Sequence, residues 1–195
     1  MTRSKIRTSG AEGLTLSSTA LTVANGLTLT DGDIAFADGH GLNFASASGD
    51  ASGMASELLD DYEEGTFTAA FAAASGTVTI SDSFKTGVYT RIGSVVTFTL
   101  HARVGSTDGS NSGNLTMTGL PFTTPNDLKY RHTIGVMAFF TLTGMTNLEL
   151  PFAYLSSNSS TLNLAITNTN NLQALNANRV TTNSEFYITG SYQIT

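Results

Sequence analysis

The sequence predicts an all-β protein in which a short β-repeat shaft precedes an antiparallel, jelly-roll-like β-sandwich head. Charged residues make up only 12% of the 195 residues, about half the usual share of roughly 25%, and Thr, Ser, Asn and Gly take their place. Thr favours strands, whereas Gly and Asn favour tight turns. Apolar and polar residues alternate over much of the chain, and no stretch has the period of a three-turn helix. The 40% of hydrophobic residues is enough for a packed core.

The first segment, residues 1–12, is a short basic arm. It carries Arg3, Lys5 and Arg7, and no apolar run follows them, so it does not read as a secretory signal. The longest apolar stretch, residues 135–142, is too short to span a bilayer. A formal net charge of −6 argues against nucleic acid as a main partner. We therefore expect a soluble protein, made in a cytoplasm, with no membrane insertion and no nucleic-acid partner.

The second segment, residues 13–55, combines a repeat with a flexible linker. Five short units place two apolar residues around a small or polar one, at residues 13–16, 20–23, 26–29, 33–36 and 41–44. Asn-Gly and Asp-Gly dipeptides mark the turns between them. One copy of the chain cannot bury these faces, because stacked repeats need neighbours. Other copies of the same chain are the obvious supply, and we expect a shaft of several chains.

The third segment, residues 56–195, alternates apolar and polar residues in longer strands. Such two-faced strands are typical of an antiparallel sandwich. The expected strands are residues 95–104, 133–142, 149–154, 161–166 and 185–194. Their expected inward residues are Val96, Phe98, Leu100, Ala102 and Val104; Ile134, Val136, Ala138, Phe140 and Leu142; Leu148, Leu150, Phe152 and Tyr154; Leu162, Leu164 and Ile166; and Phe186, Ile188, Tyr192 and Ile194.

An acidic stretch opens this head. Its carboxylates are Glu57, Asp60, Asp61, Glu63 and Glu64. We expect the apolar residues between them to pack as one turn that leaves the carboxylates in solvent, before a first strand that starts at residue 66. A cation site is the alternative, since carboxylates are ligands of hard cations, although the spacing is not that of an EF-hand. One acidic run does not supply the two separate environments that an acid–base pair needs.

Three motifs carry a resemblance to a known family. They are "LLDDYEEGTFT" at 58–68, "GVYTRIGSVVTFTLHARV" at 87–104 and "GNLTMTGLPFTT" at 113–124. This region, with the repeats before it, resembles the C-terminal part of bacteriophage tail-fibre proteins of cyanobacterial and other aquatic phages. The matching elements are an acidic opening at Leu59 to Thr66, a turn at Tyr89 to Gly93 and a turn at Gly119 to Phe122. The chain departs from the pattern at Ala69, where the family has Pro, and is short for a main tail fibre.

The resemblance implies a homotrimer that belongs to the virion and is assembled in the host cytoplasm. Residues 1–12, with Arg3, Lys5 and Arg7 as candidates, would be held by other tail, collar or head proteins. The head would attach the virion to the host surface, to polysaccharide. The alternative is an accessory head, collar or baseplate fibre, or a decoration protein, that binds no receptor.

Candidate receptor contacts lie in polar loops. Asn158, Asn168, Asn170 and Asn171 offer donors and acceptors that suit sugar hydroxyls, although asparagines also serve tight turns between strands. Tyr130 and Arg131 offer a stacking face and a hydrogen-bonding fork, or are plain surface.

We expect no enzymatic activity, no metal site and no cofactor. The chain has no Cys and no G-x-S-x-G motif, and its few head carboxylates are scattered. In a trimer, three copies of His40 near the axis are a further hypothesis for an ion site.

Overall fold

The computed structural model describes residues 33–38, 40–43, 58–59, 61–130, 132–134, 138–146, 149–168 and 171–194. The chain divides into two compact units, Met1–Phe36 and Ala37–Thr195. The predicted anchor arm and most of the predicted shaft, and with them the trimer, lie outside the described residues. From the shaft and linker, β1 (Leu42–Asn43) pairs antiparallel with β2 (Leu58–Leu59).

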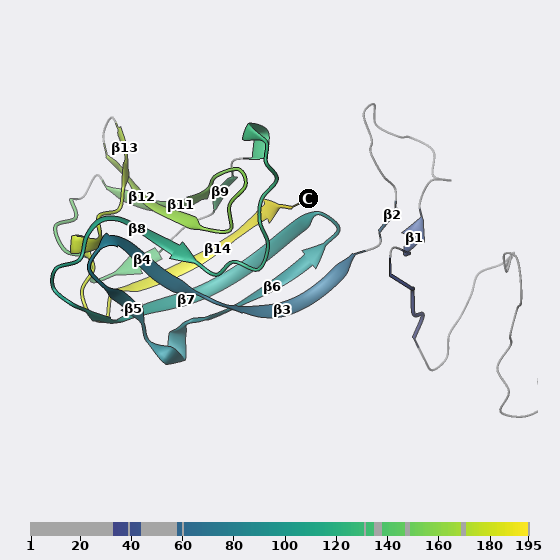
Figure 1. Cartoon of the computed structure of the whole chain (residues 1–195), viewed down its shortest axis with the longest axis horizontal. Helices are drawn as coiled ribbons and strands as arrows, with labels where there is room; N and C mark the ends of the chain where they lie inside the picture. The colour runs from purple at the N-terminus through teal and green to yellow at the C-terminus, as the bar shows by residue number, and fades with distance from the viewer. Residues whose placement is uncertain are drawn as a thin grey trace, which may run out of the picture. The chain divides into compact units, whose positions relative to one another are not determined.

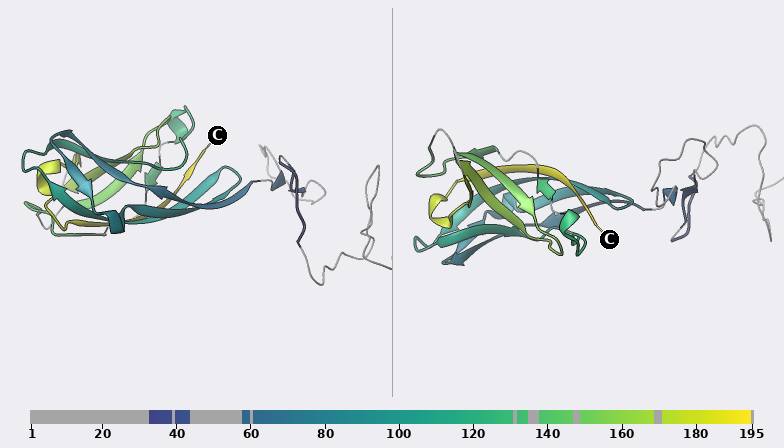
Figure 2. Two further views of the ribbon diagram at one scale, coloured as in Figure 1. Left: turned by 60° about the horizontal axis from the view of Figure 1, so that its bottom comes forward. Right: turned by 90° about the horizontal axis from the view of Figure 1, so that it is seen from above.

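Besides this pair, the second unit holds two larger antiparallel sheets that pack face to face (Figures 1 and 2). The first, called here the β7 sheet, has the order β10 (Ala138–Phe140), β14 (Glu185–Gln193), β7 (Val95–Thr107), β6 (Thr86–Ile92) and β3 (Tyr62–Thr68), with β5 (Val78–Ile80) on β7. The second, the β12 sheet, has the order β4 (Ala70–Ser75), β8 (Ser112–Thr118), β12 (Leu162–Asn168), β11 (Leu150–Leu155) and β9 (His132–Ile134), with β13 (Asn171–Ala174) on β12. The predicted all-β sandwich is confirmed.

The core lies between the two sheets and contains the residues that alternation along the strands predicted to face inward. The predicted inward residues of segments 95–104, 161–166 and 185–194 are all buried, at 6% exposure or less. Phe98 sits at the centre, with its ring edge-on to Phe67 at 5.9 Å and to Tyr192 at 6.0 Å. The helices of the described residues are three short 3₁₀ turns, η1 (Asp82–Phe84), η2 (Leu128–Tyr130) and η3 (Ala177–Arg179). None of the described helices is long and apolar enough to cross a membrane.

The strand predicted at 133–142 is wrong as a single element. β9 belongs to the β12 sheet and β10 to the β7 sheet, so the chain crosses between sheets after Ile134. Ile134 is fully buried, but Phe140 is 56% exposed and not inward-facing as predicted. A crossing changes which alternate residues face the core, so one alternation cannot describe both strands.

The face predicted for residues 149–154 is also wrong. Leu150 is 68% exposed, whereas Ala153 and Leu155 are fully buried. The register explains this, because Leu155 pairs with Leu162 and Ala153 pairs with Leu164. Directly opposed residues share a face of the sheet. Because Leu162 and Leu164 face the core, Leu155 and Ala153 face it as well.

The acidic stretch joins the sheet earlier than predicted. β3 starts at Tyr62, so Glu63 and Glu64 belong to a strand and not to a turn before it. The Tyr89 hydroxyl donates to Glu63, and the Arg91 guanidinium lies 2.7 Å from an oxygen of Asp61. These partners on β6 stabilise the acidic residues in and next to the strand. The expected first strand is also divided, because the chain crosses between sheets from β3 to β4.

Candidate functional site

The outer face of the β7 sheet carries many hydroxyl groups. Inward residues of β3, β6, β7 and β14 build the core, so the alternate residues point to solvent. Those that are threonine or serine are Thr66, Thr68, Thr86, Thr90, Thr97, Thr99, Thr189 and Ser191. The strand register lines them up in rows across the sheet, one of which runs Thr66, Val88, Thr99, Thr189.

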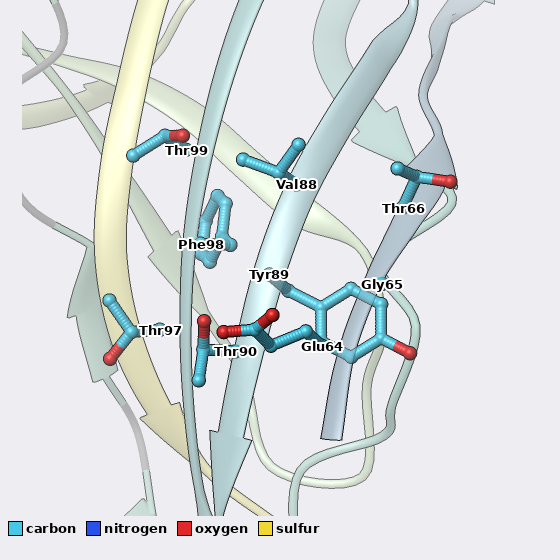
Figure 3. A pocket seen from close by; sticks show the side chains of 9 residues that line it. All are labelled: Glu64, Gly65, Thr66, Val88, Tyr89, Thr90, Thr97, Phe98 and Thr99. Carbon is cyan, nitrogen blue, oxygen red and sulfur yellow. The ribbon is translucent and has the colours of Figure 1, made fainter.

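Two shallow hollows lie on this face. The first, about 480 Å³, is lined by residues of β3, β6 and β7 (Figure 3). The second, about 370 Å³, is lined by residues of β6, β7 and β14. Val88 and Thr99 line both, so the two hollows adjoin each other. We call them together the hydroxyl groove.

Aromatic rings close one end of the hydroxyl groove. His101 and Tyr187 are opposed across β7 and β14, and their rings stack at 4.2 Å with an interplanar angle of 17°. The Phe84 ring of η1 meets His101 edge-on at 4.7 Å. The Phe140 ring of β10 meets Tyr187 edge-on at 5.9 Å. These four residues form the aromatic cluster, and His101 and Tyr187 line the groove itself.

Glu185 organises the polar side of the aromatic cluster. It accepts a hydrogen bond of 2.8 Å from the Tyr187 hydroxyl, and a nitrogen of His101 lies 3.3 Å from it. The bond from Tyr187 lowers the pKa of Glu185 below its usual value, and burial opposes the effect. The same bond raises the pKa of Tyr187. Arg103 of β7 lies 3.7 Å from Glu185 and donates to the side chain of Asn183 at 2.6 Å. These contacts join β7 to the start of β14 and the turn before it.

The predicted receptor residues lie elsewhere, at the two ends of the β12 sheet. Asn158 is exposed in the turn before β12, with a φ of 52°, and its N–H donates to the carbonyl of Pro125 at 3.0 Å. Because His132 pairs with Leu155, the end of η2 at Tyr130 lies near this same turn. A left-handed Asn is what the turn alternative expects. Arg131 lies outside the described residues.

Asn168 and Asn171 form the other end of the β12 sheet. They are opposed partners where β12 turns into β13, and Asn170 between them lies outside the described residues. The structure therefore brings Asn158 near the Tyr130 segment, and Asn168 next to Asn171, but keeps the two pairs at opposite ends of β12. None of them lines the hydroxyl groove.

The remaining predicted sites are mostly outside the described residues. Arg3, Lys5 and Arg7 lie there, as do Glu57 and Asp60 of the acidic stretch. His40 is exposed, and its N–H donates to the carbonyl of Ala37 at 3.0 Å. Among the described His, Asp and Glu side chains, no three lie close enough to hold a metal ion.

The hydroxyl groove was the functional candidate that the sequence alone did not reveal. Alternation in segment 95–104 does place Thr97, Thr99 and His101 on a polar face. The partners that turn this face into a groove come from β6 and β14, and only the register aligns them. A signal was present in "EFYITGSYQI", where Tyr187 alternates out of the core.

Comparison with known proteins shows where this fold recurs. The chain matches no protein-family model, and no curated protein matches it. Among solved structures it is similar to the crystal structure of the Dettilon tailspike protein (gp208), with a TM-score of 0.57 and 23% sequence identity. The match covers 68% of this chain and 24% of the tailspike, so this chain spans about a quarter of that protein's length. The similarity shows a shared fold.

Proposed function

We propose that this chain is a phage tail-fibre or tailspike subunit that attaches the virion to polysaccharide on the host cell surface. The observation that carries the proposal is the fold shared with a tailspike over 68% of the chain. The acidic opening and the two turn motifs, which resemble tail-fibre proteins, support it independently. The hydroxyl groove with its aromatic wall offers a surface for such a ligand.

The proposal includes the quaternary arrangement. Three copies would associate through the repeats of residues 13–55, and residues 1–12 would be held by other virion proteins. A trimer presents three heads to one surface, so weak single contacts add up to a firm attachment through avidity. The chain would bind without cleaving its ligand.

A specific observation favours a second candidate, a decoration protein. The outer face of the β12 sheet exposes apolar side chains, with Leu150 at 68% and Leu172 at 61%. The rings of Phe152 and Tyr154 lie side by side on the same strand, 6.2 Å apart. Exposed apolar patches are typical of surfaces that contact other proteins. In this reading the head would contact other virion proteins.

Cell labelling separates the two. The purified full chain, carrying a fluorophore, is mixed with a panel of cyanobacteria and other aquatic bacteria, and with mutants that lack surface polysaccharide. Attachment predicts that some strains are labelled and that their polysaccharide-deficient mutants are not. If no strain is labelled, or if the mutants are labelled equally, polysaccharide attachment is wrong and decoration becomes the better account.

A further inference from the structure

The hydroxyl groove is nearly free of charge. Among the residues that line it, Glu64 is the one charged side chain, and none is Lys or Arg. At the aromatic end, Arg103 is already engaged by Glu185 and Asn183. The groove therefore offers no lysine or arginine that is available to an anionic ligand.

Some hydroxyl groups on this face are bonded within the sheet, and others are available for hydrogen bonds to a ligand. Thr97 and Ser191 bond to each other at 2.8 Å, and Thr189 donates to the carbonyl of Phe98 at 3.2 Å. Over the part of the chain that the structure describes, Thr90 and Thr99 make no side-chain hydrogen bond, although both line the groove. Each such hydroxyl both donates and accepts, as sugar hydroxyls do.

The two outer faces of the sandwich suit different partners. Recognition of acidic glycans or phosphates relies on Arg and Lys, which the groove lacks. The outer face of the β12 sheet exposes two leucines and two neighbouring rings, which suits a protein partner, whereas the β7 sheet presents rows of threonines beside its rings. A ligand rich in hydroxyls, with apolar C–H faces and no charge, matches both the threonines and the ring wall.

We infer that the hydroxyl groove binds an uncharged polysaccharide, with the rings of His101 and Tyr187 packing against a sugar ring and the groove threonines bonding to its hydroxyls. Glu185 is a positioning residue, because it accepts the hydrogen bond of the Tyr187 hydroxyl and so fixes the orientation of a ring that lines the groove. This inference rests on the proposed function and adds the location of the site and the class of polymer.

The test uses immobilised polysaccharides and the full-length chain in a surface-binding assay. The panel holds uncharged polymers, namely a glucan, a mannan and a galactan, and acidic ones, namely a polyuronate and a sulfated galactan. We expect binding to at least one uncharged polymer, little change in that binding with added salt, and no binding to the acidic ones.

Two substitutions locate the site. Tyr187→Ala should weaken binding about tenfold, because it removes the ring wall. Thr99→Val keeps a β-branched side chain in the strand but removes one hydroxyl, and should weaken binding severalfold. The matched control is Phe152→Ala, which removes an aromatic ring from the outer face of the other sheet and should leave binding unchanged. Thermal unfolding of each variant shows whether it is folded.

Three other outcomes of the binding assay would overturn the inference. Binding only to acidic polymers overturns the inference but leaves host attachment standing. Binding to uncharged polymers that Phe152→Ala abolishes, while Tyr187→Ala and Thr99→Val do not, moves the site to the β12 sheet and overturns the inference as well. Binding to no polymer overturns it too. Cell labelling then decides whether attachment itself fails or uses another ligand.

Discussion

At the scale of single residues, two glycine–aromatic pairs explain the motif sequence around β3 and β6. Gly65 is opposed to Tyr89, and Gly87 is opposed to Phe67. A Cβ at Gly65 would lie 2.7–2.8 Å from atoms of the Tyr89 side chain, and one at Gly87 would overlap the Phe67 ring. Each ring therefore lies over a glycine on the neighbouring strand. "EGTFT" and "TGVYT" are complementary in this sense, and the pairing fixes the register of the two strands.

The first prediction follows from this packing. Gly87→Ala should lower the free energy of unfolding by about 1–3 kcal/mol, because the new methyl group forces the buried Phe67 ring out of its position. Denaturant unfolding at fixed protein concentration measures it. Thr86→Ala, at the neighbouring exposed position of the same strand, is the control and should change stability by less than about 0.5 kcal/mol. Equal effects of the two substitutions would contradict the packing argument.

Tyr192 supports a second residue-level prediction. Its side chain is 1% exposed, and its hydroxyl meets no hydrogen-bond partner within the described part of the chain. Burial raises the pKa of Tyr192 to about 12. The main chain of Phe122, which lies near the hydroxyl, lowers this pKa and so offsets part of the rise. Tyr192→Phe removes a poorly satisfied polar group, so stability should stay equal or rise by about 1 kcal/mol.

The control for this prediction is Tyr192→Ala. It removes the ring that packs against Phe98 and should cost about 3–5 kcal/mol. Thermal and denaturant unfolding measure both variants. A loss of more than about 1 kcal/mol in Tyr192→Phe would show that the hydroxyl has a bonding partner after all.

At the scale of elements, an ion pair fastens the segment before β11 to η3. Arg179 lies 2.9 Å from an oxygen of Glu149, which also accepts from the N–H of Thr146 at 2.8 Å. Glu149 is 9% exposed. The hydrogen bond from Arg179 is the largest cause, ahead of the one from Thr146, of a pKa of Glu149 below its usual value. This segment follows β10, where the chain has just changed sheets.

The third prediction is an acid-sensitive stability with a stated sign. The pKa values of Glu149 and Glu185 are lower in the folded chain than in the unfolded one. Their contribution is therefore complete above the unfolded value of about 4.3, and it is lost as the pH falls through the lower folded values. We expect the free energy of unfolding to fall between about pH 5 and pH 3.

Two variants test the origin of that fall. Glu149→Gln and Arg179→Gln should both be less stable than the wild type at pH 7, and both should show a flatter decline with acid. Denaturant unfolding at pH 7, 5, 4 and 3 measures the slope. A decline that is the same in both variants as in the wild type would assign the acid sensitivity to other groups.

The strands show how far the sequence alone could predict this fold. Segments 95–104, 161–166 and 185–194 alternate and stay in one sheet, so their buried faces were predicted correctly. Segment 133–142 changes sheets inside an unbroken apolar run, and local alternation carries no signal of that crossing. In segment 149–154 both alternating sets contain apolar residues, and pairing with β12 decides between them.

The candidate site depends even more on pairing. Thr99 and His101 were visible as polar positions of one strand, but a groove needs the neighbouring strands in the right register. Thr189 and Tyr187 come from a strand about ninety residues further along the chain, and they meet β7 only through the antiparallel pairing with β14. Polar loops can be recognised from the local sequence, so the receptor contacts were predicted there instead.

At the scale of the whole molecule, the two outer faces of the sandwich differ in the side chains that they present. The β7 sheet presents threonines and a ring wall, whereas the β12 sheet presents Leu150, Leu172 and two neighbouring rings. Under the proposed function, one head would meet a polysaccharide on one side and protein on the other. This division accommodates both attachment and contact with neighbouring virion components.

The fourth prediction concerns assembly. The repeats of residues 13–55 have too few apolar residues to form a core from one chain, so we expect several copies to associate in solution. The resemblance to tail-fibre proteins makes three the expected number. Sedimentation equilibrium on the full chain, beside residues 56–195 alone, measures the mass of each. Three copies in the full chain agree with the fibre account, and the shorter chain shows whether the repeats hold the trimer together. A strictly monomeric full chain would contradict the shaft.

The measurement that tests the central claim most directly is the labelling of bacteria by the wild-type chain and two single-site variants. On a strain that the wild type labels, Tyr187→Ala should lose most of the signal, and Phe152→Ala should keep it. That result would place attachment on the hydroxyl groove. Full labelling by Tyr187→Ala with loss in Phe152→Ala, or no labelling of any strain by the wild type, would contradict the account.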